Sequence, residues 1–317
     1  MGAERPAANL DPLYIVVLNW NLPGDTIACV RSLQQGLVPG SAIIIVDNAS
    51  TDDSLRQFRQ AFGDQVTLVA LDANRGFAGG MNAGIEVALR AGAGSVLLLN
   101  NDTIVDPAMV LHLREAAIGL PRAGILGPAI YYYDAPARLW QAGSRRYALA
   151  PVPINLGAGA LRRARGRPLR VDAVTGCAML VRREVFTRIG FFDSRYTLYY
   201  EDADFCYRAQ AAGFEIWCVP RARMWHRVSL SARQVPEATR YLAAWGRARF
   251  YRHYPHGPLS GLTLLFLLAQ AALSAIGDYA RGNPALAPLR WRATLDGYAL
   301  RPLRVGLPQG AEGAQQV

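Results

Sequence analysis

The chain has 317 residues, of which 51% are hydrophobic and 18% are charged, and this balance excludes a protein that is disordered throughout. The net charge of +10 favours anionic partners, such as a phosphorylated substrate or an acidic membrane surface. Four cysteines (Cys29, Cys177, Cys206 and Cys218) follow neither a metal-site nor a secreted-framework spacing. The N-terminus contains no apolar signal segment, so we expect a protein of the reducing cytoplasm or of the cytoplasmic side of the cell membrane.

Short apolar runs alternate with segments of helix length over the first 130 residues. This alternation predicts an α/β fold with a mostly parallel central sheet and helices on both faces. The expected strands are 14–18, 42–46, 66–70, 95–99 and 124–130, and the expected helices are 24–35, 52–62, 81–91 and 107–118. Polar clusters follow the first four strands, and ligands of such sheets bind beyond the carboxyl ends of the strands.

The pattern changes after residue 130. We expect an irregular, Arg-rich segment over 131–170, a strand at 215–219 and an aromatic, basic helix near 237–253. This organisation divides the chain into a catalytic domain at 1–235 and a C-terminal helical tail at 236–317. Within the catalytic domain, a donor-binding half at about 12–130 precedes an acceptor and catalytic half at about 131–235.

Two motifs follow the second and third expected strands. Asp47 ends the strand in IIIVDNAST, where its carboxylate can bind a nucleobase or a ribose, or cap the next helix. The glycines of NRGFAGG let backbone N–H groups approach a ligand closely. This motif is not GxGxxG and follows the third strand, which disfavours a Rossmann dinucleotide site.

Hard oxygen ligands follow the fourth strand in LNNDT. Asn100, Asn101 and Asp102 suit Mg²⁺ or Mn²⁺ with substrate phosphates. The alternative is an Asx turn that leads to Pro107.

A second acidic cluster lies in LYYEDADFCYR, where Glu201, Asp202 and Asp204 begin a helix. Acids are common at helix N-termini, but three carboxylates after an aromatic run exceed what capping requires. Acidic neighbours and an apolar wall raise a carboxyl pKa toward the range of a general base. His226, in MWHRVS, is either structural or a nitrogen ligand of a metal.

Together these motifs resemble the family 2 inverting glycosyltransferases with the GT-A fold, especially the bacterial rhamnosyltransferase-like branch. The resemblance covers about residues 14–254 and rests on VVLNWN, IIIVDNASTDDS, NRGFAGGMNAGI, LLLNNDT, VTGCAMLVRREVF, GFFDSRYTLYYEDADFCYR and a later WH, in family order. It implies a mostly parallel sheet flanked by helices, and an enzyme that transfers a sugar with inversion, using Mg²⁺ or Mn²⁺.

The resemblance also implies a role for individual residues. Asp202 corresponds to the catalytic base, with Glu201 and Asp204 as supporting acids. Asp102 corresponds to the metal ligand of the Asp-x-Asp motif, whose first acid is Asn100 here, and His226 completes the metal or diphosphate site. The residues expected to bind the nucleotide-sugar are Leu18, Asn19, Trp20, Asp47, Arg75, Gly76 and Asn101.

The resemblance implies a dTDP- or UDP-sugar as the donor, with L-rhamnose as the expected sugar, and a saccharide or lipid-linked acceptor; nucleic acid is not an expected partner. Two other function classes stay open. A nucleotidyltransferase shares the sheet and a metal-bound acid, but VVLNWNLPG lacks its Gly-rich, basic signature. A non-catalytic membrane scaffold is disfavoured by the intact Asp47, Asp102 and Asp202.

The uncharged segment 259–276 predicts a membrane-associated tail. At about 1.5 Å per residue, such a helix is near the lower limit for spanning a bilayer of roughly 30 Å. Arginines on both flanks suit a helix that lies in an anionic leaflet better than one that crosses it. The alternative is a helix that packs against the protein or in a homodimer.

Overall fold

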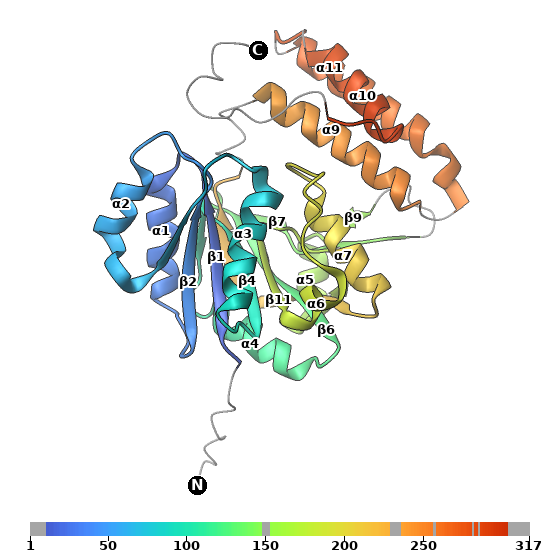
Figure 1. Cartoon of the computed structure of the whole chain (residues 1–317). Coiled ribbons are helices and arrows are strands. Elements are labelled where there is room, and N and C mark those ends of the chain that lie inside the picture. The colour runs from blue at the N-terminus through green and yellow to red at the C-terminus, as the bar shows by residue number, and fades with distance from the viewer. Residues whose placement is uncertain are drawn as a thin grey trace.

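The computed structural model describes residues 11–147, 153–228, 236–255, 258–280, 282–284 and 286–303. Its centre is a twisted sheet with strand order β10-β12-β6-β11-β4-β1-β2-β3, with β5 paired to β12 and β7 paired to β6 (Figure 1). The strands of this sheet are β1 (Leu13–Asn19), β2 (Ser41–Asp47), β3 (Thr67–Ala70), β4 (Ser95–Asn100), β5 (Thr103–Val105), β6 (Ala123–Tyr132), β7 (Leu139–Gln141), β10 (Leu169–Val171), β11 (Ala178–Arg182) and β12 (Glu215–His226).

The half of the sheet made by β4, β1, β2 and β3 is parallel, as predicted. Because side chains alternate along a strand, Ile15 and Val17 enter one core layer and Val16 enters the other. One face is covered by α1 (Pro23–Gln34), α2 (Ser54–Phe62) and α4 (Met109–Gly119). The other is covered by α3 (Gly76–Arg90), α6 (Arg183–Ile189) and α7 (Glu201–Ala211). The four cysteines are buried within these layers, as predicted.

The other half of the sheet departs from the prediction of continuous parallel strands. β11 lies antiparallel between β4 and β6, so the strand expected at 124–130 does not neighbour β4. The apolar run of β11 is buried on both faces, which makes it a central strand. β12 also continues seven residues beyond the predicted end at 219, with a register shift between Val219 and Arg223, and ends at His226.

Two further expectations about local structure were wrong. The helix expected at 81–91 is present as α3 but begins earlier, at Gly76. Its first turns pack closely on the end of β1, since a Cβ on Gly80 would lie 2.6 Å from Leu18 Cδ1. The segment 131–170, expected to be irregular, contains β7, β10, the pair β8 (Ser144–Arg145) and β9 (Ile154–Asn155), and α5 (Ala158–Ala164). LRRARGRPLR therefore forms the end of α5 and the start of β10.

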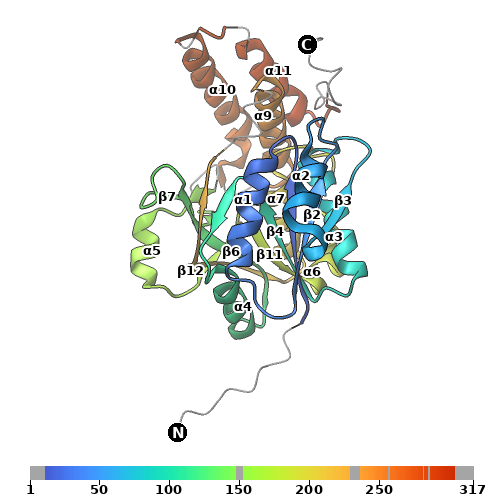
Figure 2. The same ribbon diagram turned by 90° about the vertical axis from the view of Figure 1, so that its left-hand side faces the viewer.

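The C-terminal part consists of helices α9 (Pro236–His253), α10 (Thr263–Ala280) and α11 (Leu286–Tyr298), with a short 3₁₀ helix η2 at Pro258–Leu262 (Figure 2). The domain boundary expected at 235 falls outside the described residues. α9 buries Tyr241, Trp245 and Phe250 in the core layer shared with α3 and α7. These helices therefore pack on the catalytic part through α9.

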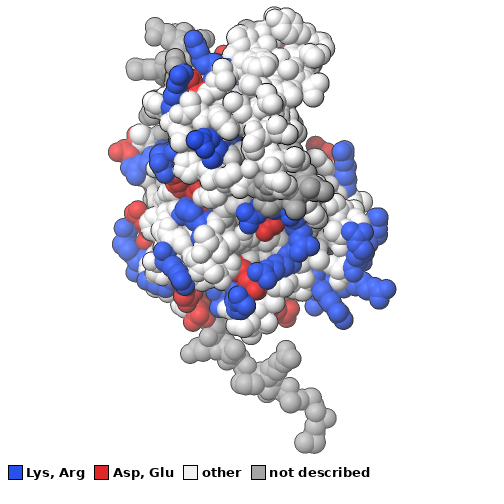
Figure 3. Space-filling model, turned by 90° about the vertical axis from the view of Figure 1, so that its right-hand side faces the viewer, with Lys and Arg blue, Asp and Glu red and all other residues white. Residues whose placement is uncertain are grey.

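α10 carries the largest apolar exposure in the described part of the chain. Leu265, Leu273 and Ile276 are each 65–70% exposed, while Leu267 and Ala271 face inward. Pro258–Ala280 is long and apolar enough to cross a membrane, although length and composition alone do not distinguish a membrane helix from a packing helix. Figure 3 shows the upper end of the molecule, where the tail lies, almost free of charge on one side.

Candidate active site

A cavity of about 210 Å³ lies beyond the carboxyl ends of the parallel strands. All four predicted strand ends reach it, as the polar clusters indicated. Its donor-side wall is formed by Leu18, Trp20, Asn48, Asn74, Gly76, Phe77, Asn100, Asn101 and Asp102. The opposite wall is formed by Trp140, Thr175, Gly176, Cys177, Leu198, Tyr199, Glu201, Asp202 and His226.

A buried hydrogen-bond network lies beneath the donor-side wall. Asn19 Nδ2 donates to Asp47 Oδ1 at 2.8 Å, and the Ser50 backbone N–H and hydroxyl donate to the same carboxylate at 3.0 and 2.6 Å. Thr26 donates to Asn19 Oδ1 at 2.8 Å and accepts from Asn101 Nδ2 at 2.9 Å. Asn19 and Asp47 thus join the ends of β1 and β2 and support the wall, while Asn101 lines the cavity.

A second asparagine network fixes the start of α3. Asn48 Nδ2 donates to Asn74 Oδ1 at 2.9 Å and to the Gly76 carbonyl at 3.0 Å. Asn48 Oδ1 accepts the Arg75 backbone N–H at 2.9 Å. The Arg75 side chain instead points to the surface and pairs with Asp72 at 2.8 Å. Asn48 and Asn74 were missing from the sequence prediction, although they lie in its IIIVDNAST and NRGFAGG motifs.

Asp102 and His226 lie together on the floor of the cavity. The register that pairs His226 of β12 with Thr103 of β5 brings them close, and His226 Nε2 lies 3.0 Å from Asp102 Oδ1. Both side chains are about 95% buried. Trp140 packs edge-on against the His226 ring, with centroids 4.7 Å apart. Trp140 was missed because it lies in the segment expected to be irregular.

The floor fits a divalent cation. Asn100 Oδ1 and His226 Nδ1 are buried without a hydrogen-bond partner, and Asp102 Oδ1 and His226 Nε2 have only each other, at 3.0 Å. Such atoms are costly to bury unless a ligand completes them. No cluster of three or more His, Cys, Asp or Glu side chains suited to a metal exists among the described residues. Mg²⁺ or Mn²⁺ held by Asp102 and His226 would therefore take its remaining ligands from water and substrate phosphates.

Asp202 lies on the opposite wall, at the start of α7. Its two carboxylate oxygens accept the backbone N–H groups of Gly176 at 2.8 Å and Ala203 at 2.7 Å. Desolvation by the surrounding protein raises the pKa of Asp202, and these hydrogen bonds oppose that shift without cancelling it. A held carboxylate with a raised pKa matches the requirements for a general base.

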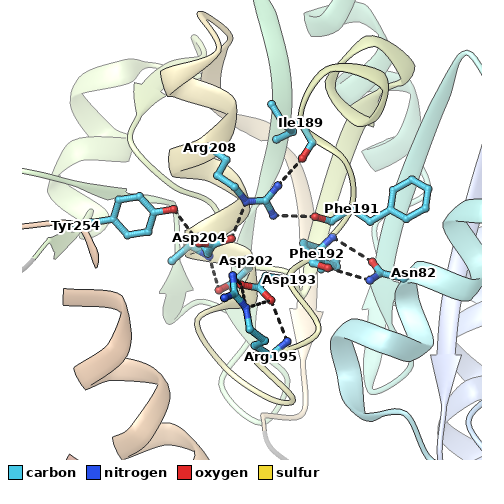
Figure 4. A network of polar contacts seen from close by, with 11 residues as sticks. Asn82, Ile189, Phe191, Phe192, Asp193, Arg195, Asp202, Asp204, Arg208 and Tyr254 are labelled. Atoms are coloured by element: carbon cyan, nitrogen blue, oxygen red, sulfur yellow. Dashed lines mark hydrogen bonds and ion pairs between the residues drawn. The ribbon is translucent and has the colours of Figure 1, made fainter. Parts of the chain in front are cut away.

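The neighbouring acids differ from Asp202. Burial, and secondly the charge of Asp202, raise the pKa of Glu201 well above its ordinary value, so Glu201 favours the protonated form. Its Oε2 is buried without a partner at the cavity wall. Asp204 is directed away from the cavity: it accepts from Arg208 Nε and from the Tyr254 hydroxyl, both at 2.8 Å (Figure 4).

The loop before α7 has a constrained backbone. Tyr199 and Tyr200 both adopt left-handed φ angles, 69° and 72°, which is uncommon for bulky residues and frequent at functional sites. Phe77 N–H donates to the Thr197 carbonyl at 2.8 Å, and a Cβ on Gly76 would lie 2.6 Å from that oxygen. Gly76 is therefore needed where α3 meets the loop that carries Asp202.

Helix α9 supports the same loop from outside. Arg247 Nε donates to the Tyr200 hydroxyl at 2.9 Å, and Arg247 also binds Gln270 of α10 at 3.1 Å. A Cβ on Gly246 would lie 3.0 Å from the Tyr199 carbonyl oxygen. The tail therefore contacts the residues beside Asp202, which the sequence prediction did not foresee.

Comparison with known proteins assigns the family. The model of the glycosyltransferase like family 2 matches residues 11–258, which cover most of the chain. The chain belongs to this family. It is 32% identical over 227 residues to an N-acetylglucosaminyl-diphospho-decaprenol L-rhamnosyltransferase of Mycobacterium tuberculosis, covering 66% of this chain and 73% of that protein. It is 24% identical over 218 residues to the dTDP-rhamnosyl transferase RfbF of Shigella flexneri, covering 68% and 69% of the two chains.

Solved structures show the same fold. The mannosyltransferase PcManGT from Pyrobaculum calidifontis, in complex with GDP-Man and Mn²⁺, matches with a TM-score of 0.57 at 16% identity and covers 92% of this chain and 88% of its own. GalNAc-T7 with UDP, GalNAc and Mn²⁺ matches with a TM-score of 0.58 at 17% identity, covering 81% of this chain and 54% of that one. The fold is GT-A, as predicted.

Proposed function

We propose that this family 2 glycosyltransferase moves L-rhamnose from dTDP-L-rhamnose to a saccharide or polyprenyl-linked acceptor in cell-surface polysaccharide synthesis. One observation carries the assignment of the site: a single cavity holds the strand-end polar groups, the Asp102–His226 pair and Asp202 on facing walls. The names of the rhamnosyltransferase relatives support the sugar and the lipid-linked acceptor.

Asp202 is the proposed catalytic base. The backbone N–H groups of Gly176 and Ala203 hold its carboxylate in place, and its raised pKa strengthens it as a proton acceptor. Asp202 takes the proton of the acceptor hydroxyl as that oxygen attacks the anomeric carbon from the face opposite the diphosphate. A single displacement inverts the configuration, so no second carboxylate nucleophile is needed.

Asp102 and His226 are the proposed ligands of the cation, with Asn100 Oδ1 beside them. When bound, Mg²⁺ or Mn²⁺ supplies positive charge against the departing diphosphate. Mn²⁺ in two structural neighbours supports this proposal. Leu18, Trp20, Gly76 and Asn101 line the proposed nucleotide-sugar pocket, and Asn19 and Asp47 support it from below. Arg75 reaches the nucleotide only if it releases Asp72.

The C-terminal helices are proposed to attach the enzyme to the cytoplasmic face of the membrane. The exposed apolar face of α10 suits the acyl region of a leaflet, whereas Gln270 faces Arg247 of α9. We retain 1–235 as the catalytic unit and 236–317 as the attaching tail, with α9 belonging structurally to both.

The test is release of nucleoside diphosphate from a panel of sugar nucleotides, with a polyprenyl-diphosphate saccharide as acceptor. We expect the largest kcat/KM with dTDP-L-rhamnose, in the presence of Mn²⁺ or Mg²⁺. A clear preference for another sugar overturns the donor assignment, and no turnover of any sugar nucleotide overturns the proposed function.

A further inference from the structure

A second cavity lies on the other side of the first turn of α7. Its volume is about 310 Å³, at the small end of the roughly 300–1,000 Å³ of ligand pockets. It is lined by Phe191, Asp193, Arg195, Tyr196, Asp204, Arg208, Arg249, His253 and Tyr254. Three arginines and two aspartates give this lining an excess of positive charge.

Two of the three arginines are paired within the protein. Arg208 donates to Asp204 and to the carbonyl oxygens of Ile189 and Phe191, at 2.7–2.8 Å (Figure 4). Arg195 binds both carboxylate oxygens of Asp193 at 2.9 Å. Burial alone would raise the pKa of Asp193, but the hydrogen bonds and charge of Arg195 outweigh it and lower that pKa. Both aspartates are therefore occupied by these two arginines.

The third arginine, Arg249 of α9, has no carboxylate partner. It is 93% buried, and its Nε lacks any hydrogen-bond partner. Its guanidinium stacks over the rings of Trp245 and Tyr196, with centroids 5.2 and 5.8 Å away, and borders the cavity. Stacking fixes the plane of the guanidinium but gives its Nε no hydrogen-bond acceptor. The nearest opposing charge is Asp193, on whose pKa Arg249 acts through its charge but with which it forms no ion pair within 4.0 Å. A buried guanidinium without a hydrogen-bonded anion is costly, so a further anion would complete it.

The chemistry of Arg249 selects the class of ligand. A planar guanidinium held on aromatic rings offers parallel N–H donors that match two oxygens of a phosphate. Tyr196 and His253 also line the cavity, and each carries a polar group that can bind phosphate oxygens. An anionic phosphate or diphosphate group therefore fits this site.

The position of the cavity indicates where that group comes from. Asp202 and Asp204 are separated by about 3 Å along the axis of α7 and border the two different cavities. Arg249, His253 and Tyr254 come from the helix and turn that lead directly to the exposed apolar face of α10. If the saccharide of a lipid-linked acceptor lies at Asp202, its lipid chain can lie at the exposed apolar face of α10. The diphosphate that joins the saccharide to the lipid would then lie between Asp202 and α10, where the second cavity is.

We infer that the Arg249 cavity binds the diphosphate of a lipid-linked acceptor while the saccharide lies at Asp202. This inference rests on the proposed function, and it assigns to α9 a substrate-binding surface in addition to its packing role. Removing the guanidinium removes two charge-assisted hydrogen bonds from acceptor binding only.

The experiment compares Arg249→Gln with Arg252→Gln, a matched control on the same helix whose exposed side chain is not in the cavity lining. Initial rates are measured with a polyprenyl-diphosphate saccharide, with its short-chain, water-soluble diphosphate analogue, and with the free saccharide. We expect Arg249→Gln to raise KM for both diphosphate acceptors by about tenfold or more. In Arg249→Gln, KM for the free saccharide and KM for the donor should stay at the wild-type values. In Arg252→Gln, KM for each of the three acceptors should also stay at the wild-type value.

Each other outcome contradicts the inference. Equal KM values in Arg249→Gln and wild type overturn it, and a loss confined to the long-chain acceptor would assign the cavity to the lipid chain. If Arg249→Gln does not fold, Arg249→Lys takes its place, because lysine keeps the positive charge but lacks the two parallel N–H donors of a guanidinium. An unchanged KM for the diphosphate acceptors in Arg249→Lys overturns the inference. If the wild type turns over no donor, the proposed function fails, but the cavity can still be tested. The Kd of the short-chain diphosphate saccharide is then compared between Arg249→Gln and Arg252→Gln.

Discussion

The hydrogen-bond network beneath the catalytic cavity and several polar groups that line the cavity differ in how they are satisfied. Beneath the donor-side wall, Asn19, Asp47 and Asn48 are fully engaged with protein partners. Along the cavity, Trp20 Nε1, Asn100 Oδ1 and His226 Nδ1 have no hydrogen-bond partner, and Asp102 Oδ1 contacts only His226 Nε2, at 3.0 Å. An unsatisfied buried polar group costs about 1–3 kcal/mol, so such groups persist where a ligand or reaction uses them.

This difference separates structural support from chemistry. Substitutions on the chemical side should reduce turnover or metal-dependent binding while the fold stays near its wild-type stability. Substitutions in the satisfied network should reduce donor affinity and stability together, because they leave buried donors without acceptors.

The largest effect is expected from Asp202→Asn. The amide preserves the shape of the side chain but cannot accept the proton, so kcat should fall by about 10²–10⁴-fold while the donor Kd stays near wild type. The measurement is single-turnover transfer together with donor binding by calorimetry.

Glu201→Gln is the matched control for this variant. Because Glu201 favours the protonated, neutral form, a neutral amide of the same size should change kcat by less than about tenfold. Comparable turnover in Asp202→Asn and wild type would move the base to Glu201 or Asp204.

The next effect concerns the floor of the cavity. Asp102→Ala should weaken donor binding in Mn²⁺ buffer, and the difference from wild type should vanish in EDTA, which should also remove wild-type activity. The melting temperature should change little, because the only side-chain polar contact that Asp102 Oδ1 loses is the 3.0 Å pair with His226 Nε2. Normal turnover of EDTA-treated enzyme would show that the cation is not required.

A smaller effect on turnover, with a loss of stability, is expected from Asp47→Ala. The variant deprives Asn19 and Ser50 of their shared acceptor and should cost about 1–3 kcal/mol in the free energy of unfolding. Donor KM should rise more than kcat falls, since the nucleotide wall shifts in ground and transition states alike. A loss of kcat alone, at unchanged stability, would place Asp47 with the chemical groups instead.

The smallest effect on chemistry is expected from the tail. Replacing Leu265, Leu273 and Ile276 of α10 together with Gln should release the protein from anionic liposomes without changing turnover of soluble substrates. Ile118→Gln, an exposed apolar residue of α4, serves as the control. If the wild-type protein binds no anionic liposomes, α10 is a packing helix or a dimer contact.

The sequence was most informative where a short motif follows a strand. The strand-end motifs identified the donor-side wall, and the juxtaposition of Asp102 with His226 follows the predicted sharing of one site. Local patterns could do this because parallel strands bring their carboxyl ends to one edge.

The missed features depend on contacts distant in the sequence. Three features were missed: the insertion of β11 between β4 and β6, the packing of Trp140 against His226, and the hydrogen bond from Arg247 to Tyr200. Each joins segments that are far apart in the sequence, and the hydrophobic periodicity of a segment does not indicate which other segment it contacts. Arg75 differs from the prediction in another way. The family resemblance implied that it contacts the nucleotide, but its side chain pairs with nearby Asp72.

The central claim is a single displacement assisted by one base, Asp202, and the anomeric configuration of the product tests it most directly. NMR of the glycoside formed from a donor of known configuration should show complete inversion, with no glycosyl-enzyme intermediate trapped in Asp202→Asn. A product with retained configuration would contradict this account, because a single attack from the face opposite the diphosphate must invert the anomeric carbon.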